Sequence, residues 1–290
     1  MAAAQEKRIG LVYQPRKPEA VELAAALSQR IRAAGIETWT ESAWEEAAVS
    51  ASLPGTDLVL TFGGDGTIIR TLRLAAPLGV AVAGVNFGKL GFLAEVEADE
   101  VAAALPRLLA ADYWCEERAL LAITHRRAGA VVGEYLAVNE ALISRGRANR
   151  VVRLQLWIHG EYVTTYAADG LILATPTGST GSNLANLGPV LPPDMRALIV
   201  SPVLPFVSFP NPLIVPEGAP LRVRAVFDHE AVLAIDGQRT IALQNEDVIE
   251  ATIAPYPCLL ARLRGRHYFY RVLVPGLQRA PLLPSTPEGG

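Results

Sequence analysis

The sequence predicts two domains of different class, an N-terminal three-layer α/β domain with a mainly parallel sheet and a C-terminal β-rich, sandwich-like domain. Apolar strands alternate with amphipathic helices over about the first hundred residues, which is typical of an α/β domain. Between residues 112 and 254 the pattern changes to short β-rich runs separated by turns. The expected boundaries are 1–105 for the first domain, 106–262 for the second, and 263–290 for a tail whose first part docks back on the first domain.

The elements of the first domain follow from apolar patterns and from proline and glycine. A helix is expected from Pro18, which suits a first helical turn, to Ala34, where Gly35 suits the end. The run 79–85 is apolar on both faces, as a central strand of a parallel sheet should be. The remaining expected elements are strands at 8–13, 36–40 and 57–62 and a helix at 98–111.

The second domain is expected to consist mainly of strands. The β-rich runs lie at 120–126, 131–143, 151–158, 171–174, 221–227, 231–235 and 248–253. The longest apolar stretch, around 198–215, is interrupted by prolines and does not reach the ~20 uninterrupted residues that a membrane span needs.

The amino-acid composition favours a globular protein and argues against several other classes of protein. The 290-residue chain is 51% hydrophobic and 19% charged, as a well-cored globular protein is. Its net charge of −3 argues against coating nucleic acid, which needs a dense basic face. Two cysteines form no disulfide framework, no apolar signal core opens the chain, and no histidine pair has metal-ligand spacing. We therefore expect a cytoplasmic protein with no structural zinc, no membrane and no nucleic-acid partner.

A glycine-rich turn, Gly63-Gly64-Asp65-Gly66-Thr67, follows the strand at 57–62 and precedes a helix-like pattern. Glycines let a backbone approach an anion closely, and a helix N-terminus presents unpaired N–H groups to it. The turn therefore indicates phosphate binding, with Asp65 as an unexpected acid. Such an acid can hold a metal or accept a proton from a nucleophile. The alternative is a tight turn in which Asp65 caps the helix.

Two further stretches carry polar groups at strand ends. Asn86 follows the strand at 79–85, and carboxyl ends of parallel strands face one crevice, so Asn86 and the glycine turn should face the same ligand. The loop 175–182 is rich in threonine, serine and glycine, which suits sugar hydroxyls and phosphates. Its alternative is a solvated loop of turn-forming residues.

Taken together, these stretches resemble the NAD kinase family. The motifs occur in the family's order: Gly63-Gly64-Asp65-Gly66-Thr67, Asn86-x-Gly88-x-Leu90-Gly91-Phe92-Leu93, Asn139-Glu140, Asp169-Gly170-Leu171-Ile172, Thr175-Pro176-Thr177-Gly178-Ser179-Thr180 and Asp236-Gly237-Gln238. The resemblance implies a first domain like that of phosphofructokinases. It also implies transfer of a terminal phosphoryl group to the 2′-hydroxyl of the adenosine ribose of NAD.

The resemblance gives Asp65 the role of proton acceptor, which a weakly nucleophilic secondary alcohol requires. It places Asn139 and Glu140 near ribose or adenine, Asp169 near nicotinamide or ribose, and Thr180 near adenine. Alternatives stay open for Arg70 as an exposed helix residue, for Asn139-Glu140 as a plain turn, and for Arg150 as a surface residue. The full expected binding set is Gly63, Gly64, Gly66, Thr67, Arg70, Asn86, Asn139, Glu140, Arg150, Asp169, Thr177, Ser179, Thr180 and Gln238.

The implied cofactor is Mg²⁺, which enters with the phosphoryl donor, and no direct protein ligand to the metal is expected. The implied small-molecule partners are NAD or NADH and ATP or polyphosphate. By the same resemblance we expect a homodimer or homotetramer.

The sequence departs from the family around the second half of the site. After Thr180 the family continues with Ala-Tyr, whereas this chain has Gly181-Ser182, and Leu187 alters the following motif. A stacked ring is worth ~1–3 kcal/mol per base at other stacking sites, so its loss should weaken dinucleotide affinity. Ala167 and Phe206 replace a usual basic residue and a usual Pro-His-Ser segment.

These departures leave other functions open beside NAD phosphorylation. One is a non-catalytic regulator that binds NAD(H) or a nucleotide, and another is a kinase of this fold with a different hydroxyl acceptor. A lipid kinase rests only on the glycine turn, which diacylglycerol and sphingosine kinases share. An intact Asp65 favours the NAD kinase, because a non-catalytic descendant has no chemical need for that acid.

Overall fold

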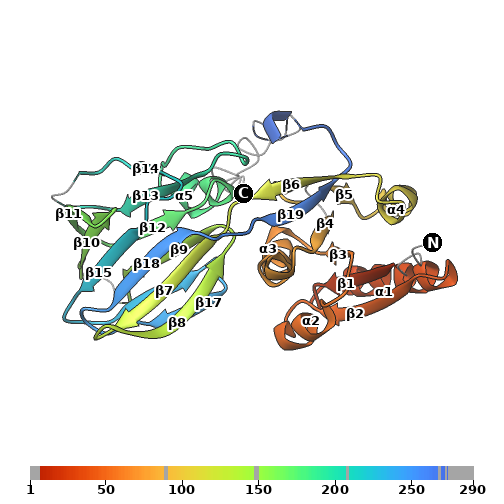
Figure 1. Ribbon diagram of the computed structural model, residues 1–290, viewed down its shortest axis with the longest axis horizontal. Helices are drawn as coiled ribbons and strands as arrows, with labels where there is room; N and C mark the ends of the chain where they lie inside the picture. Colours follow the sequence, from red (N-terminus) through yellow and green to blue (C-terminus); the bar gives the residue numbers. More distant parts are fainter. Residues whose placement is uncertain are drawn as a thin grey trace, which may run out of the picture. The chain divides into compact units, whose positions relative to one another are not determined.

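The computed structural model describes residues 7–87, 91–146, 150–206, 209–266, 269–271 and 273. It divides into two compact units (Figure 1). The first contains residues 1–71, 81–115 and 260–290, and the second contains residues 72–80 and 116–259. Residues 88–90, which include Gly88 and Leu90 of the expected binding motif, lie outside the described part.

A sheet with strand order β2-β1-β3-β4-β19-β6 organises the first unit, and β5 pairs with β4. Strands β1 to β5 pair in parallel, which confirms the predicted α/β class with a mainly parallel sheet. The bounds are Arg8–Tyr13 (β1), Glu37–Ser42 (β2), Leu58–Phe62 (β3), Ala81–Asn86 (β4), Val96–Glu97 (β5), Trp114–Arg118 (β6) and Cys258–Arg262 (β19). The sequence did not predict β19 as a member of this sheet.

Helices pack beside these strands because each has one small or apolar face. Helix α1 (Pro18–Ala33) begins at a proline and buries Ala20, Ala24, Leu27 and Ile31, and it contacts β1 and β2 (Figure 1). The chain also forms α2 (Glu46–Ser52), α3 (Asp65–Ala75), the 3₁₀ turn η1 (Ala76–Leu78) and α4 (Val101–Leu109). The end of α3 and η1 lie within residues 72–80, which belong to the second unit.

The second unit contains two antiparallel sheets, ordered β11-β10-β15-β18-β7-β8 and β14-β13-β12-β9-β16-β17. Their inward side chains form one apolar core, to which Leu154, Val223 and Ile249 contribute from the first sheet and Leu171, Val200 and Leu233 from the second. The predicted β-rich, sandwich-like class is therefore confirmed.

The strands of this unit are Leu121–Arg127 (β7), Ala130–Ala137 (β8), Glu140–Arg145 (β9), Val152–Ile158 (β10), Glu161–Ala168 (β11), Gly170–Ala174 (β12), Ala197–Val203 (β13), Leu213–Pro216 (β14), Leu221–Val226 (β15), Ala231–Ile235 (β16), Arg239–Ala242 (β17) and Val248–Ile253 (β18). Two short helical segments, η2 (Thr177–Thr180) and α5 (Ser182–Ala185), follow β12. The expected run 131–143 is two strands rather than one, because β8 and β9 belong to different sheets and the chain turns between them. Strand β13 was also missed, since Pro202 and its neighbours suggested an interrupted stretch.

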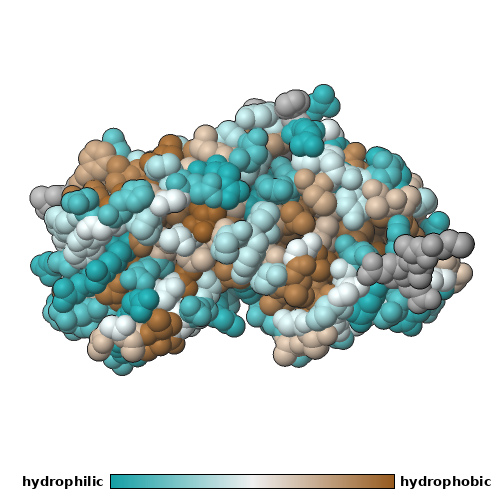
Figure 2. Space-filling model, in the orientation of Figure 1, coloured by the Kyte–Doolittle hydropathy of each residue, from teal (hydrophilic) through white to brown (hydrophobic). Residues whose placement is uncertain are grey.

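None of the helices in the described ranges is long and apolar enough to cross a membrane. On the face shown in Figure 2, hydrophobic patches are interrupted by hydrophilic residues.

Gly84 on β4 lets helix α3 lie close to the sheet. A Cβ at this position would lie 2.5 Å from Ile68 Cδ1 and 3.1 Å from Ala94 Cα. We predict that Gly84→Ala lowers the free energy of unfolding by about 1–3 kcal/mol through overpacking, as measured by urea unfolding. Gly265→Ala is the matched control, because a Cβ there meets no atom within 4 Å. Equal stabilities of the two variants would contradict this account of the packing.

Candidate functional site

The glycine turn connects β3 to α3 through a tight backbone path. Gly63 N donates to Val85 O at 3.0 Å on the neighbouring strand, and Thr67 N donates to Gly64 O at 2.9 Å. Gly63 has no room for a side chain, since a Cβ would lie 2.5 Å from Thr67 Oγ1. Gly64 is half-buried and Gly66 is exposed at the surface of this turn.

Asp65 is the first residue of α3, and its carboxylate is held from the segment that follows β4. Phe92 N donates to Oδ2 at 3.0 Å and Leu93 N donates to Oδ1 at 3.3 Å. Gly91 allows this close approach, because a Cβ there would lie 2.2 Å from Oδ1. The carboxylate is therefore fixed in orientation by groups outside its own helix.

A buried ion pair fixes the segment that binds Asp65. Arg262, at the end of β19, donates to Leu93 O at 3.0 Å and to Glu95 Oε2 at 3.2 Å. The other oxygen of Glu95 accepts the backbone N–H groups of Leu263 at 2.9 Å and Arg264 at 2.8 Å. The returning strand β19 thus anchors the loop that in turn positions Asp65. Sequence reasoning missed both members of this pair, which lie 167 residues apart.

Two other expected residues of the first unit have defined surroundings. Arg70, for which the alternative was an exposed helix residue, is half-buried on α3 and pairs with Glu46 at 2.5 Å. A guanidinium has five N–H donors, so this pairing is compatible with a phosphate contact, which stays a prediction. Asn86 is buried and lines a cavity of about 620 Å³ together with Arg16 and Lys17.

In the second unit, Asp236 holds the turn that carries Asn139 and Glu140. Its carboxylate accepts the backbone N–H groups of Val138 at 3.0 Å, Asn139 at 2.8 Å and Glu140 at 3.1 Å. Arg73 lies 3.7 Å from the same carboxylate and donates to Gln238 Oε1 at 3.3 Å. Burial outweighs the amide hydrogen bonds and leaves the pKa of Asp236 above its usual value. Asp236 was part of a recognised motif, but its clamping role was not foreseen.

Glu140 is a buried acid with one satisfied oxygen. Its Oε1 accepts a hydrogen bond from Ser182 Oγ at 2.5 Å, while the buried Oε2 has no partner among the described residues. Burial raises the pKa of the Glu140 carboxyl, and the nearby Asp236 raises it further, whereas the Ser182 hydrogen bond lowers it. The position where the resemblance expects a tyrosine is thus used by a hydroxyl that binds Glu140.

The hydroxyl groups of the loop after β12 form hydrogen bonds mainly within the protein. Ser179 is fully buried, donates to Pro176 O at 2.6 Å and accepts from Leu191 N at 3.0 Å. Thr180 Oγ1 donates to Thr177 O at 3.1 Å, and Thr177 Oγ1 accepts from the buried Arg118 at 3.3 Å. The side chain of Ser179 is therefore committed to structure, and ligand contacts of this loop stay a prediction.

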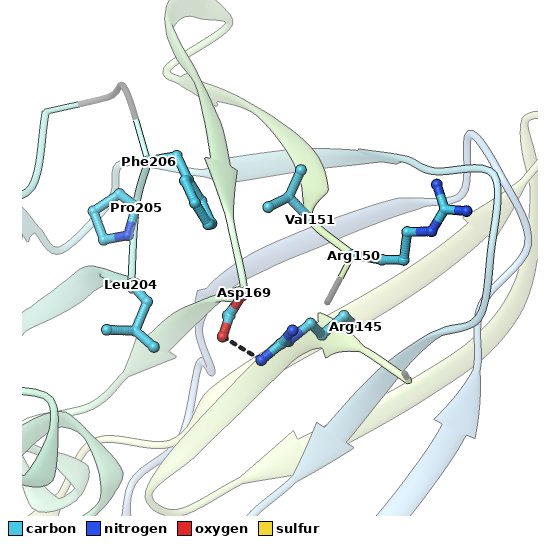
Figure 3. A pocket seen from close by; sticks show the side chains of 7 residues that line it. All are labelled: Arg145, Arg150, Val151, Asp169, Leu204, Pro205 and Phe206. Carbon is cyan, nitrogen blue, oxygen red and sulfur yellow. Dashed lines mark ion pairs between the residues drawn. The ribbon is translucent and has the colours of Figure 1, made fainter. Parts of the chain in front are cut away.

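Asp169 and Arg150 line one cavity of about 470 Å³ (Figure 3). Arg145, which sequence reasoning missed, pairs with Asp169 at 2.6 Å. The register of β9 against β12 brings them together, since Ser144 lies opposite Gly170. Phe206 lines the same cavity, and its backbone N–H donates to Ala167 O at 2.9 Å, so these two departures from the family are neighbours.

No group of three or more His, Cys, Asp or Glu side chains in the described ranges is arranged to hold a metal ion.

Comparisons with known proteins identify the family to which the chain is similar. Residues 4–113 match the family model of the ATP-NAD kinase N-terminal domain, and residues 138–263 match that of the ATP-NAD kinase C-terminal domain. An NAD kinase of Dehalococcoides mccartyi (strain CBDB1) is 35% identical over 92% of this chain and 94% of its own. An NAD kinase of Heliobacterium modesticaldum is 37% identical over 93% of this chain and 98% of its own.

Solved structures share the fold. Yeast NADH kinase complexed with NADH has a TM-score of 0.78 at 22% identity, covering 97% of this chain and 90% of that one. An NAD kinase from Archaeoglobus fulgidus in complex with ATP has a TM-score of 0.73 at 22% identity, covering 93% and 98%. The fold and the matched domains define a two-domain phosphotransferase. The chain belongs to the NAD kinase family, and its activity is that of an NAD kinase.

The burial of Glu140 predicts a pH-dependent effect of neutralising it. Because its pKa is raised in the folded state, the ionised carboxyl destabilises the fold above that pKa. We expect Glu140→Gln to raise the free energy of unfolding at pH 8 by about 1–2 kcal/mol, with the gain shrinking as acid protonates the native glutamate. Urea unfolding from pH 8 to pH 5 measures this. Glu134→Gln on exposed β8 is the control, and a pH-independent gain at Glu140 would contradict the prediction.

Proposed function

We propose that this NAD kinase uses Asp65 to accept the proton of the 2′-hydroxyl of the adenosine ribose of NAD. The phosphoryl donor is ATP or polyphosphate, and the product is NADP. The observation that carries the proposal is the fixed carboxylate inside the glycine turn, with Phe92 N and Leu93 N bound to its two oxygens. A proton acceptor works best when its orientation is set before the substrate arrives.

The chemistry follows from the proton acceptor and the turn. As the 2′-oxygen gives its proton to Asp65, it forms a bond to the terminal phosphorus of the donor. The bond between that phosphorus and the bridging oxygen breaks, and ADP or a shortened polyphosphate leaves with the electron pair. Carboxylate oxygens each accept more than one hydrogen bond, so Asp65 keeps its amide partners while it binds the hydroxyl.

The glycine turn supplies the phosphate-binding half of the proposal. Gly63, Gly64 and Gly66 allow a close backbone approach, and the N-terminus of α3 offers N–H groups to negative oxygens. Thr67 and Arg70 complete this set. Mg²⁺, which would enter with the donor, would supply positive charge that neutralises the phosphate oxygens.

The dinucleotide-binding half consists of Asn139, Glu140, Asp169 and Arg150, with the loop of Thr177 and Thr180. The Glu140 Oε2 atom is a buried acceptor without a partner among the described residues, which suits a ligand hydroxyl or amino group. The cavity beside Asp169 suits the second nucleotide of NAD or NADH.

The proposal includes a homodimer or homotetramer and a cytoplasmic location. A reducing compartment agrees with the two cysteines, which both lie in the described part and form no disulfide. Burial raises the pKa of the Cys258 thiol to about 12, so it is a core group rather than a nucleophile.

Replacing Asp65 with Asn tests the proton-acceptor role. We expect kcat for NADP formation to fall by roughly 100- to 10,000-fold, because an amide cannot take the proton. Calorimetry should show NAD affinity within about threefold of the unaltered protein, since the change removes an interaction of the transition state. Asp57→Asn is the matched control, because Asp57 also accepts a backbone N–H, from Arg8 at 2.8 Å, at the opposite end of β3.

Retained turnover in Asp65→Asn would remove Asp65 as the proton acceptor. Absence of NADP from the unaltered protein with both ATP and polyphosphate, despite NAD binding, would overturn the catalytic proposal itself. A melting temperature close to that of the unaltered protein shows that the variant is folded.

A further inference from the structure

The two carboxyl oxygens of Glu140 differ in their hydrogen bonding. The residue is 7% exposed, so water contributes little to either oxygen. Ser182 Oγ binds Oε1 at 2.5 Å, and Oε2 is buried without a partner among the described residues. An unpaired buried acceptor costs free energy, and a ligand that donates to it recovers that cost on binding.

The backbone of Gly181 lies next to Oε2. Gly181 carries no side chain, and a Cβ there would lie 3.1 Å from Oε2 and 3.5 Å from Asn139 Nδ2. Gly181 therefore lies beside an acceptor, the Glu140 oxygen, and a donor, the Asn139 amide. A ligand edge that both donates and accepts hydrogen bonds matches this pair.

Ser182 determines which way the carboxyl group faces. The backbone N–H of Glu140 is already held by Asp236 at 3.1 Å, so the remaining freedom lies in the side chain. An ionised carboxylate only accepts hydrogen bonds, so the Ser182 hydroxyl is the donor. Its bond to Oε1 removes one of the two orientations and leaves Oε2 beside Gly181.

We propose that Ser182 is a positioning residue that keeps the Glu140 carboxylate oriented, so that Oε2 accepts a hydrogen bond from a hydroxyl or amino group of the bound dinucleotide. The identity of the ligand rests on the proposed function, whereas the action of Ser182 on Glu140 does not. This role takes the position where the resemblance expects an aromatic ring. At this position a hydroxyl that binds Glu140 therefore stands in place of the ring.

The proposal predicts a coupling between ligand binding and pH. A ligand that donates to Oε2 needs the ionised form of Glu140, and the Ser182 hydrogen bond favours that form. Among the described residues, Asp236 opposes ionisation of this carboxyl, and Arg73 lies 3.7 Å from Asp236. Removing the Ser182 hydroxyl should therefore move protonation of Glu140 to higher pH.

The test compares Ser182→Ala with Ser182→Thr and Ser201→Ala. Threonine keeps a hydroxyl at the same position. Ser201 is the matched control, because its Oγ accepts from Asn186 Nδ2 at 3.0 Å and so supports the same loop without touching Glu140. Carbon-13 NMR of the carboxyl group follows the titration of Glu140 without ligand, and calorimetry follows NAD binding from pH 5 to pH 8.

We expect Ser182→Ala to raise the titration midpoint of Glu140 by about one pH unit and to weaken NAD binding about tenfold at pH 6, with a smaller loss at pH 8. Ser182→Thr and Ser201→Ala should keep the unaltered midpoint. An unchanged midpoint in Ser182→Ala, or the same rise in Ser201→Ala, would overturn the proposal.

The experiment distinguishes a failure of the Ser182 proposal from a failure of the proposed function. If the unaltered protein forms no NADP, the proposed function fails, and the ligand-free titration still decides the role of Ser182. If NADP forms and the Ser182→Ala binding profile parallels the unaltered one at every pH, the inference fails alone.

Discussion

Backbone N–H groups that donate to carboxylates hold the loops of this protein. Asp65 accepts from Phe92 and Leu93, and Asp236 accepts from the whole turn between β8 and β9. Glu95 does the same for the chain that leaves β19. Loop amides have no strand partner, and an unpaired buried N–H is costly. A charged acceptor satisfies them with hydrogen bonds roughly twice as strong as neutral ones. Each carboxylate therefore converts an irregular segment into a fixed part of the scaffold.

The hydrogen-bond partners of the carboxylate oxygens distinguish Asp236 and Glu95 from Glu140. Asp236 and Glu95 have their oxygens occupied by protein groups. Glu140 has one oxygen bound to Ser182 and the other unpaired among the described residues. Burying Glu140 without a ligand is unfavourable for the stability of the fold. Residues that destabilise an otherwise well-satisfied structure are often functional. Stability and binding thus oppose each other at this one side chain.

Local patterns were enough to predict a large part of the fold. The parallel strands, the glycine turn and the β-rich character of the second unit follow from periodicity and turn residues, and comparison of the structure with these predictions confirms the fold class. What the sequence could not supply was pairing over long separations. Strand β19 enters the first sheet from the far end of the chain, and the run 131–143 divides into two strands at a turn held by an aspartate 97 residues away from Asn139. The positions of Arg145 beside Asp169 and Arg262 beside Glu95 depend on the same long-range register.

For the candidate site residues, too, the sequence predicted the residue types but not their long-range contacts. Sequence motifs identified Asp65, Asn139 and Glu140 as chemically informative, but not the groups that orient them. Ser179 was predicted to bind a ligand, which stays a prediction, and its hydroxyl binds Pro176 O and Leu191 N of its own loop region. The residue types therefore indicated the chemistry of the site, whereas the structure was needed to show which side-chain atoms already form hydrogen bonds within the protein.

Amide hydrogen exchange in the ligand-free protein tests the carboxylate–amide clamps most directly. The amides of Phe92, Leu93, Val138, Asn139 and Glu140 lie at loops, turns or strand ends, where exchange is ordinarily fast. If carboxylates hold them, they should exchange at rates close to those of amides in the paired strands β4 and β9. Exchange at the rate of an open loop for the Phe92 and Leu93 amides, or for all three amides at Asp236, would contradict the account.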